Sequence, residues 1–558
     1  MKRRAKLFIS SWRTTALISI FGLAYLFLIS NLYNIQFNKN SFYEALAENQ
    51  QRAAGVLDPL RGSIYFTDKN NNQVPAVINK QYSLIYAVPK EISDSAVAAP
   101  RLSGILNLDA ASLEKKLSKP NDLFEELLFK ASDEQVDEIN NSGIKGLYIK
   151  NEVGRYYPFG TLASQLLGFT NSNGNGGDDT VLVNGQYGVE KYFNEELGGV
   201  PGKLQGDKVV ATQDGENVNL TIDYNIQAQS EDILKNLVSE KGAAGGSIIV
   251  EDPKTGKILT MASYPDFDPN DYSQYEIKNF LNPTVQAVYE PGSVFKILTM
   301  AAGIDSGKIT PDTTYVDKGY DIINGRKIMN WDHRAYGKIT MTNVIEHSLN
   351  LGSTFAEQTM GRDIFKSYLY KFGLADLTGI ELPGELKGNL SQLDHGRDIN
   401  YATASYGQGV SVTPIEMINA ASAIANGGNL MKPNILSDEQ PTVIRRVISE
   451  DTAKKVTQMM VSAVKVNVLA DIPNYRVAGK TGTAFVPDFK NGGYSDQVIN
   501  TYIGWAPAFD PKFVLLVRLD KPKDAPLAGT TVVPAFRQLA EYILNYYNIP
   551  PDKIGNNE

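Results

Sequence analysis

The sequence predicts an α+β protein with an N-terminal transmembrane helix, an α/β domain after it, and a larger C-terminal domain in which helices pack on a mainly antiparallel sheet. The 558 residues exceed what one hydrophobic core usually holds, so we expect two or more domains. A long apolar stretch near the N-terminus indicates the membrane helix. Strand-like runs at both ends of the C-terminal part, with helical patterns between them, indicate the antiparallel sheet.

Composition excludes several classes of function. With 42% hydrophobic and 21% charged residues, the chain is typical of a globular protein. The net charge of -8 and the lack of a long Lys/Arg run argue against nucleic acid as a partner. Because the chain has no cysteine, disulfides, thiolate metal sites and cysteine nucleophiles are excluded. The three histidines, His333, His347 and His395, lack the paired spacing of metal ligands, so we expect no metal and no cofactor.

The apolar stretch at 14–38 contains no charged side chain and is long enough to cross a bilayer. Several Lys and Arg residues precede it, whereas only Lys39 follows closely. This bias predicts a cytoplasmic tail at 1–13 and an extracytoplasmic location for the rest of the chain. A cleaved signal peptide is the alternative, but no small-x-small cleavage pattern follows the apolar run.

The first domain, at 39–220, shows a mixed pattern and no candidate chemistry. Its expected elements are a polar stalk at 41–52, a strand at 83–88, an amphipathic helix at 121–140 and a flexible loop at 171–180.

The second domain is expected at 221–558. An amphipathic helix at 226–238 leads into a hairpin formed by 246–251 and 257–263. Its remaining expected elements are helical segments at 293–305, 342–370 and 413–426, strands at 476–486, 499–507 and 512–520, and a closing helix at 536–544.

One serine stands out as a candidate nucleophile. The stretch Glu290-Pro291-Gly292-Ser293 runs directly into an apolar helical pattern, which places Ser293 in the first turn of a helix. Lys296, three residues later, lies on the same face. A hydroxyl beside an amine that can accept its proton allows covalent catalysis without histidine. Three other Ser-x-x-Lys pairs lack the Pro-Gly approach, and we interpret them as accidental surface pairs: Ser112/Lys115, Ser142/Lys145 and Ser462/Lys465.

Two further motifs follow Ser293, namely Ser348-Leu349-Asn350 and Lys480-Thr481-Gly482-Thr483. In this order the three motifs are typical of class A β-lactamases and penicillin-binding proteins. The run Lys254-Thr255-Gly256 repeats one tripeptide, but it precedes Ser293 and fits a hairpin turn. Burial and the charge of Lys480 would lower the pKa of Lys296, and the neutral amine could then accept the Ser293 proton.

On these motifs the chain resembles the class B penicillin-binding proteins, which are membrane-anchored peptidoglycan D,D-transpeptidases. The resemblance covers nearly the whole length and implies an elongated α/β pedestal domain at 39–220 and a penicillin-binding, β-lactamase-like transpeptidase domain at 221–558. The stretches that resemble the pedestal are Arg61-Gly62-Ser63-Ile64, Tyr156-Tyr157-Pro158-Phe159-Gly160 and Gly188-Val189-Glu190. Those that resemble the transpeptidase domain are Asp252-Pro253-Lys254-Thr255-Gly256, Phe372-Gly373, Gly379-Ile380-Glu381-Leu382-Pro383-Gly384-Glu385 and Tyr406-Gly407-Gln408-Gly409.

The resemblance also implies roles for the motif residues. Ser348 would relay a proton to the leaving amine, and Asn350 would hold Lys296 and the substrate amide. The backbone N–H groups of Ser293 and Thr483 would form the oxyanion hole. His347 beside Ser348 suggests a triad, but we expect its side chain to point away. The substrate-binding segment would be Lys480, Thr481, Gly482 and Thr483, with the ammonium and the two hydroxyls on the terminal carboxylate.

The implied function is cross-linking of D-Ala-D-Ala stem peptides through a Ser293 acyl-enzyme, with inhibition by β-lactams. The alternatives are a D,D-carboxypeptidase or β-lactamase-type hydrolase, and a non-catalytic penicillin-binding scaffold or sensor. The implied partners are the membrane and a SEDS-family glycosyltransferase of the RodA/FtsW type. Subgroup features are mixed, with Lys480-Thr481-Gly482-Thr483 and Gly168-Phe169-Thr170-Asn171 closer to the division type and Tyr156-Tyr157-Pro158 closer to the elongation type. We favour division.

Overall fold

The computed structural model describes residues 59–120, 122–172, 183–205, 208–488, 490–523 and 527–553, together with positions 16, 19, 21–23 and 25. The expected tail at 1–13, most of the anchor at 14–38, the stalk at 41–52 and nearly all of the loop at 171–180 lie outside these residues. Within the described part of the chain, no helix combines the length and the apolar character needed to cross a membrane.

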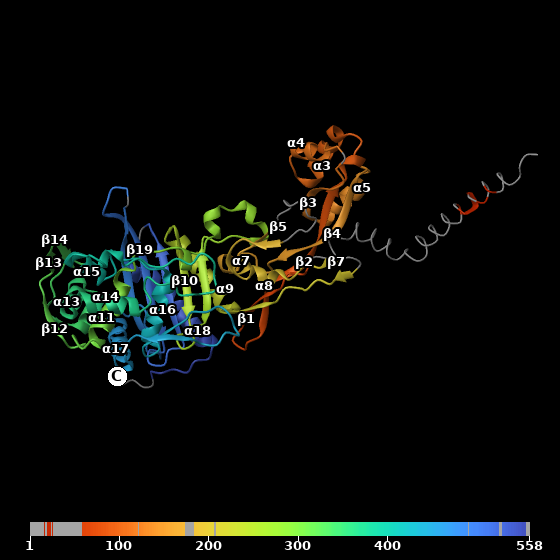
Figure 1. The fold of residues 1–558 in the computed structure, drawn as a ribbon. Coiled ribbons are helices and arrows are strands. Elements are labelled where there is room, and N and C mark those ends of the chain that lie inside the picture. The colour runs from red at the N-terminus through yellow and green to blue at the C-terminus, as the bar shows by residue number, and fades with distance from the viewer. Residues whose placement is uncertain are drawn as a thin grey trace, which may run out of the picture. The chain divides into compact units, whose positions relative to one another are not determined.

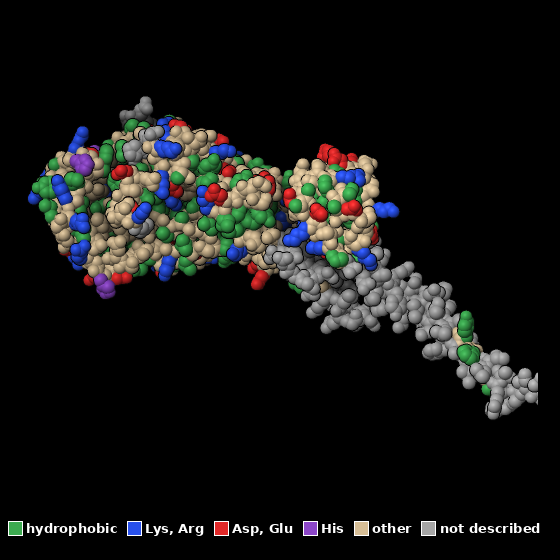
Figure 2. Space-filling model, turned by 90° about the horizontal axis from the view of Figure 1, so that it is seen from above, with side chains coloured by type: hydrophobic (Ala, Val, Ile, Leu, Met, Phe, Trp, Pro, Cys, Tyr) green, Lys and Arg blue, Asp and Glu red, His purple; other side chains and the backbone are tan. Residues whose placement is uncertain are grey.

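The chain divides into two compact units. The smaller unit comprises Met1–Leu60, Ser172–Val183 and Gly198–Gly215, and its described part contains a hairpin of β7 (Lys203–Gln205) and β8 (Lys208–Val210). The larger unit comprises Arg61–Asn171, Asn184–Leu197 and Glu216–Glu558. Acidic and basic side chains are interspersed on the face seen in Figure 2, as on an ordinary solvated surface.

The larger unit begins with a five-stranded sheet in the order β3-β2-β1-β9, in which β4 also pairs with β2. One part of it packs against three helices through an apolar core that includes Ile85, Leu102 and Leu127. The strands are β1 (Ile64–Thr67), β2 (Gln73–Ala87), β3 (Glu125–Ala131), β4 (Leu147–Tyr156) and β9 (Val218–Asp223), and the helices are α3 (Ser95–Leu106), α4 (Ala110–Leu117) and α5 (Asp133–Asn141).

The helix expected at 121–140 is wrong in its first part. Residues Glu125–Ala131 form strand β3, which pairs antiparallel with β2 through partners such as Leu84 and Phe129. Helix α5 begins only at Asp133, where Ser132 caps it with a reciprocal bond to Gln135. Tertiary pairing therefore overrides the helical pattern that the charged residues of this segment suggest.

The second sheet confirms the predicted antiparallel architecture. Its five strands lie in the order β11-β10-β20-β19-β18, and every neighbouring pair is antiparallel. Figure 1 shows helices on both faces of this sheet. The strands are β10 (Gly245–Glu251), β11 (Ile258–Tyr264), β18 (Ala478–Pro487), β19 (Tyr494–Ala506) and β20 (Phe513–Asp520).

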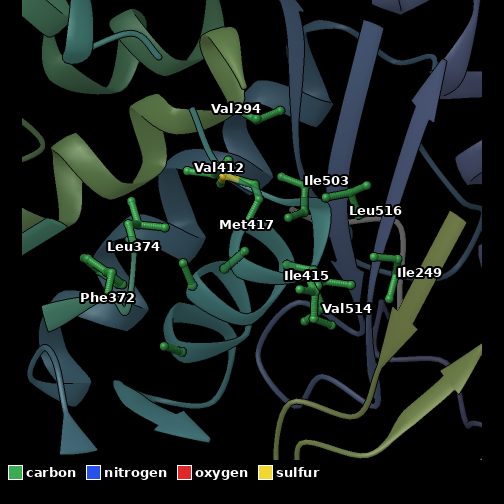
Figure 3. Packing of buried hydrophobic residues seen from close by; sticks show 14 of the residues in the cluster. Ile249, Val294, Phe372, Leu374, Val412, Ile415, Met417, Ile503, Val514 and Leu516 are labelled. Carbon is green, nitrogen blue, oxygen red and sulfur yellow. The ribbon is translucent and has the colours of Figure 1, made fainter. Parts of the chain in front are cut away.

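Side-chain alternation along these strands builds two cores. On one face Leu515, Val517 and Leu519 join a cluster with α9 (Tyr224–Glu240) and α18 (Val532–Tyr546). On the other face Ile249, Val514 and Leu516 pack near Ile415 and Met417 of α16 (Pro414–Ala425), as Figure 3 shows. The second face also receives the helix that follows Ser293, which places the nucleophile turn against the sheet.

The helical segment expected at 342–370 is broken into three helices. The first break lies between Glu346 and Asn350, where Ser348 has a φ of 55°. The helices of this region are α11 (Lys296–Asp305), α12 (Met341–Glu346), α13 (Asn350–Met360), α14 (Arg362–Lys371), α15 (Asp398–Ala404) and α17 (Glu450–Val466). The small strands are β12 (Thr314–Asp317), β13 (Tyr320–Ile323), β14 (Arg326–Met329), β15 (Gly337–Thr340), β16 (Asn429–Met431) and β17 (Val443–Arg446).

A buried ion network joins the pedestal-like motifs. The carboxylate of Glu190 lies 2.7 Å from Arg61 Nε and 2.7 Å from Arg155 Nη2. Arg61 also donates to Asn194 and Arg155 to Asn79, each at 3.0 Å. All three charged side chains are buried. Their ion pairs and hydrogen bonds therefore replace the hydrogen bonds to water that these groups lose on folding.

We predict that Glu190→Ala lowers the free energy of unfolding by about 3–5 kcal/mol, because it leaves two buried guanidinium groups without their carboxylate. Denaturant unfolding followed by circular dichroism measures this loss. Glu195→Ala, which removes an exposed carboxylate five residues further on, is the control and should change stability by less than about 0.5 kcal/mol. Equal stability of the two variants would contradict the prediction.

Candidate active site

The nucleophile turn begins with Pro291 and Gly292 and forms a short 3-10 helix, Gly292–Phe295, before α11 starts at Lys296. Gly292 has a φ of 60°, a value that glycine adopts without strain. Ser293 is partly exposed, whereas Val294 and Phe295 are fully buried and anchor the turn. The turn therefore presents its hydroxyl at the surface of a well-packed element.

Backbone contacts hold this turn from two sides. The N–H of Gly292 donates to the carbonyl of Gly407 at 3.0 Å, and a Cβ on Gly407 would lie 2.2 Å from the carbonyl oxygen of Gly292. On the other side, a Cβ on Gly482 would lie 2.9 Å from the carbonyl oxygen of Pro291. Glycine is required wherever two backbones approach this closely. The predicted motif glycines thus let β18 and the 407–409 turn reach the nucleophile.

The amino group of Lys296 is fully buried and points to the α12–α13 junction. It donates to the carbonyl of Ser348 at 2.6 Å and to Asn350 Oδ1 at 2.9 Å, and it lies 3.4 Å from Ser348 Oγ. The left-handed backbone of Ser348 breaks the helix and turns its carbonyl and hydroxyl toward this amine. Such a conformation in a non-glycine residue is a strain that functional sites often retain.

Lys480 reaches the same serine from β18. Its Nζ donates to Ser348 Oγ at 2.9 Å and to the carbonyl of Thr481 at 2.9 Å, and it lies 3.4 Å from Thr481 Oγ1. Lys480 is only 3% exposed. Two buried amines therefore meet at the hydroxyl of Ser348.

The pKa values of both lysines are lowered, which favours the neutral amine. Burial, and secondly the nearby ammonium of Lys480, lower the pKa of Lys296 well below its ordinary value. Burial lowers the pKa of Lys480 to about 7. The shift of Lys296 has the direction expected from the sequence, and it suits a base that must accept a proton near neutral pH.

The structure brings together Lys296, Ser348, Asn350 and Lys480 in one hydrogen-bonded group, next to the turn that carries Ser293. Among the described residues, the hydrogen bonds of Lys296 Nζ go to Ser348 and Asn350, and none goes to the Ser293 hydroxyl. Side chains of a free active site often align only when substrate binds.

The other predicted residues of β18 lie beside this group. Gly482 packs against the turn, and the hydroxyl of Thr483 accepts a hydrogen bond from the N–H of Ala528 at 3.3 Å.

The other candidate pairs lie elsewhere. Ser462 of α17 bonds to Glu346, whereas Lys254-Thr255-Gly256 forms the turn between β10 and β11, where Thr255 Oγ1 donates to Asp252 at 2.7 Å. Ser112 lies in α4, where the Asp109 side chain caps its N–H, and Ser142 ends α5. No group of three or more metal-ligating side chains exists within the described part of the chain.

Sequence reasoning missed the residues that support Asn350 and the serine loop. Asn350 Nδ2 donates to the carbonyl of Met329 at 2.9 Å, and Trp331 Nε1 donates to the carbonyl of His347 at 3.0 Å. The His347 ring lies 5.2 Å from the ring of Tyr336. Met329 ends β14, whereas Trp331 and Tyr336 lie in the loop between β14 and β15. This region carries no motif that could have revealed the contacts.

Comparisons with known proteins agree with this arrangement. The family described as "Penicillin binding protein transpeptidase domain" matches residues 246–541, and the "Penicillin-binding Protein dimerisation domain" matches residues 56–225. Stage V sporulation protein D of Bacillus subtilis is 30% identical over 96% of this chain and 86% of its own length. Peptidoglycan D,D-transpeptidase FtsI of Escherichia coli K12 is 29% identical over 98% of this chain and 93% of its own.

Solved structures of the same group share the fold. Penicillin Binding Protein 2X of Streptococcus thermophilus superposes with a TM-score of 0.72 at 23% identity, covering 88% of this chain and 80% of that one. Penicillin binding protein 3 of Mycobacterium tuberculosis, solved with aztreonam, has a TM-score of 0.68 at 27% identity and covers 88% of this chain and 97% of that one. Two family domains in this order, and relatives that align along nearly the whole chain, identify it as a class B penicillin-binding protein.

Proposed function

We propose that the chain cross-links peptidoglycan as a D,D-transpeptidase, through an acyl-enzyme on Ser293. The observation that carries the proposal is the meeting of Lys296 and Lys480 at Ser348, beside the turn of Ser293. This group supplies a nucleophile, a base with a lowered pKa, a proton relay and a cation, which together are sufficient for acyl transfer.

In the acylation step, the Ser293 hydroxyl attacks the carbonyl of the penultimate D-alanine, and neutral Lys296 accepts the hydroxyl proton. The oxyanion of the tetrahedral intermediate is stabilised by the backbone N–H groups of Ser293 and Thr483. Contact between the nucleophile turn and β18 supports this pairing, because it keeps the two N–H groups on neighbouring elements.

Collapse of the intermediate breaks the peptide bond and releases D-alanine. The proton that Lys296 took passes through the hydroxyl of Ser348 to the leaving amine, a route supported by the 3.4 Å separation of Lys296 Nζ and Ser348 Oγ. The amine of a second stem peptide then attacks the ester, and the same groups act in reverse to return the proton to Ser293. Asn350 holds Lys296 throughout and contacts the substrate amide.

Lys480 binds the terminal carboxylate of the stem, with the hydroxyls of Thr481 and Thr483 beside it. An ammonium and two hydroxyls complement a carboxylate. A β-lactam presents a similar carboxylate and a reactive amide to the same groups, so it acylates Ser293 and remains attached. Gly482 leaves room for the nucleophile turn.

A hydrolase is the second candidate, since it would share the first step. Hydrolysis of an acyl-enzyme requires a base that activates water. Among the described residues, no Asp or Glu hydrogen-bonds to Lys296, Ser348, Asn350 or Lys480. The match to the transpeptidase family and the similarity to relatives named D,D-transpeptidases favour transfer to an amine over transfer to water.

The anchor at 14–38, the pedestal at 39–220 and the transpeptidase domain at 221–558 are part of the proposal. In this proposal the catalytic domain lies outside the cytoplasmic membrane. Its partner is a SEDS-family glycosyltransferase, and its favoured role is cell division. A tagged full-length chain should therefore sediment with membranes and co-purify with such a polymerase. Recovery of the chain in the soluble fraction, without a polymerase, would contradict this placement.

Substitution of the nucleophile tests the assignment of Ser293. We predict that a fluorescent penicillin forms a stable covalent adduct with the wild-type chain and none with Ser293→Ala, because the attacking oxygen is removed. Gel fluorescence and peptide mass spectrometry measure the adduct. Ser462→Ala, at a Ser-x-x-Lys pair on α17, is the matched control and should label normally. Labelling of Ser293→Ala would overturn the assignment.

The pH profile tests the role of Lys480. Because its pKa is lowered to about 7, Lys480 is charged below this pH and loses its charge above it. The second-order rate constant of β-lactam acylation should therefore fall by roughly tenfold or more between pH 6 and pH 9. Lys480→Arg keeps its charge over this range and should remove the alkaline fall, even if the overall rate is lower. A wild-type rate that rises steadily to pH 9 would contradict this role.

A further inference from the structure

The carboxylate of Glu290, three residues before Ser293, bonds to a segment that is distant in the sequence. Tyr494 at the start of β19 donates its hydroxyl to Glu290, at 3.0 Å and 3.3 Å from the two carboxylate oxygens. Burial raises the pKa of this carboxyl, and the bond from Tyr494 counteracts the rise. We call the Glu290–Tyr494 pair the Glu290 clamp.

The clamp connects two elements that already touch at the nucleophile turn. Tyr494 pairs with Pro487 near the end of the β18–β19 hairpin, and β18 carries Thr483. On the other side of the turn, the carbonyl of Gly407 accepts the N–H of Gly292. One carboxylate therefore joins the hairpin that carries Thr483 to the turn that carries Ser293.

Close backbone contacts around the nucleophile turn occur at glycines. A Cβ on Gly292 would lie 3.0 Å from the carbonyl oxygen of Thr483, and Gly407 and Gly482 pack just as closely. Glycine allows close approach but contributes no side chain that would fix the distance. A charge-assisted hydrogen bond from Tyr494 to Glu290 supplies a side-chain connection across the same gap.

We propose that Glu290 is a positioning residue for acylation, and that its bond to Tyr494 holds the β18–β19 hairpin in register with Ser293. This proposal rests on the proposed function, because it concerns the placement of the Ser293 hydroxyl and of the two oxyanion N–H groups.

Glu290 lies outside the hydrogen-bonded group that contains Lys296, Ser348 and Lys480. Among the described residues, its carboxylate has no hydrogen bond to Lys296, Ser348 or Lys480. The oxyanion hole depends on donor positions within a few tenths of an ångström, and a small displacement of a reacting group slows catalysis strongly. The clamp should therefore affect the rate of bond formation more than the affinity for the ligand.

Stopped-flow measurement with a chromogenic cephalosporin separates the rate of acylation from the affinity for the ligand. For Tyr494→Phe, which removes only the hydroxyl, the first-order acylation constant should fall about tenfold, while the dissociation constant of the non-covalent complex changes less than about twofold. The melting temperature should stay within about 2 °C of the wild type, because one partly exposed hydrogen bond is lost.

Tyr148→Phe is the matched control. Tyr148 donates its hydroxyl to Glu91 at 2.6 Å in the β2–β4 region, so the variant loses the same kind of exposed bond far from Ser293 in the sequence. It should acylate at the wild-type rate. Equal acylation constants for Tyr494→Phe, Tyr148→Phe and the wild type would overturn the proposal.

Variants of the carboxylate complete the test. Glu290→Gln retains an acceptor for Tyr494 and should keep more activity than Glu290→Ala. In the Tyr494→Phe background, Glu290→Ala should slow acylation much less than it does in the wild type, because the bond is already lost. Fully additive losses would show that the two residues act separately and would overturn the clamp.

The site of the adduct distinguishes failure of this inference from failure of the proposed function. In every clamp variant, peptide mass spectrometry should find the acyl group on Ser293, formed more slowly. An adduct on another residue would contradict the proposed function. Wild-type rates with the adduct on Ser293 would contradict the clamp alone.

Discussion

Two lysine side chains buried at one serine hydroxyl impose the main constraint on the site. Ser348 Oγ lies 2.9 Å from Lys480 Nζ and 3.4 Å from Lys296 Nζ. Burial disfavours the charged form of both amines, and the ammonium of Lys480 further disfavours that of Lys296. The surrounding groups are carbonyl, amide and hydroxyl oxygens. A carboxylate at this place would stabilise the ammonium of Lys296 and remove the proposed base. None of the hydrogen bonds described around these lysines involves such a carboxylate. The proposed role of Lys296 as a base depends on this.

The fold makes this convergence possible by combining distant parts of the chain. The second sheet places Lys480 on the face that packs against α11 and α16, and the break between α12 and α13 turns Ser348 toward the buried amine. Glycines at 292, 407 and 482 let three backbones approach the nucleophile turn within contact distance. Each of these features is local in the sequence, but their combined geometry depends on the tertiary packing.

The sequence predicted the motif residues because their types and order are characteristic, and it predicted the antiparallel sheet because strand patterns lie at both ends of the domain. It gave no sign that Ser348 takes a left-handed conformation, since no glycine or asparagine marks the position. It also misassigned Glu125–Ala131, whose charged residues suggest a helix but whose pairing with β2 makes a strand. The bond between Glu290 and Tyr494 joins residues that are far apart in the chain, and no local pattern can reveal such a contact.

Product analysis tests the central claim most directly. The full-length chain would be incubated with peptidoglycan strands that carry D-Ala-D-Ala stems and with an isotopically labelled acceptor amine, and the products would be separated by mass spectrometry. The account predicts release of D-alanine together with label in a new amide bond, and neither product with Ser293→Ala. Release of D-alanine with only shortened, unlabelled stems would show a hydrolase and contradict the account.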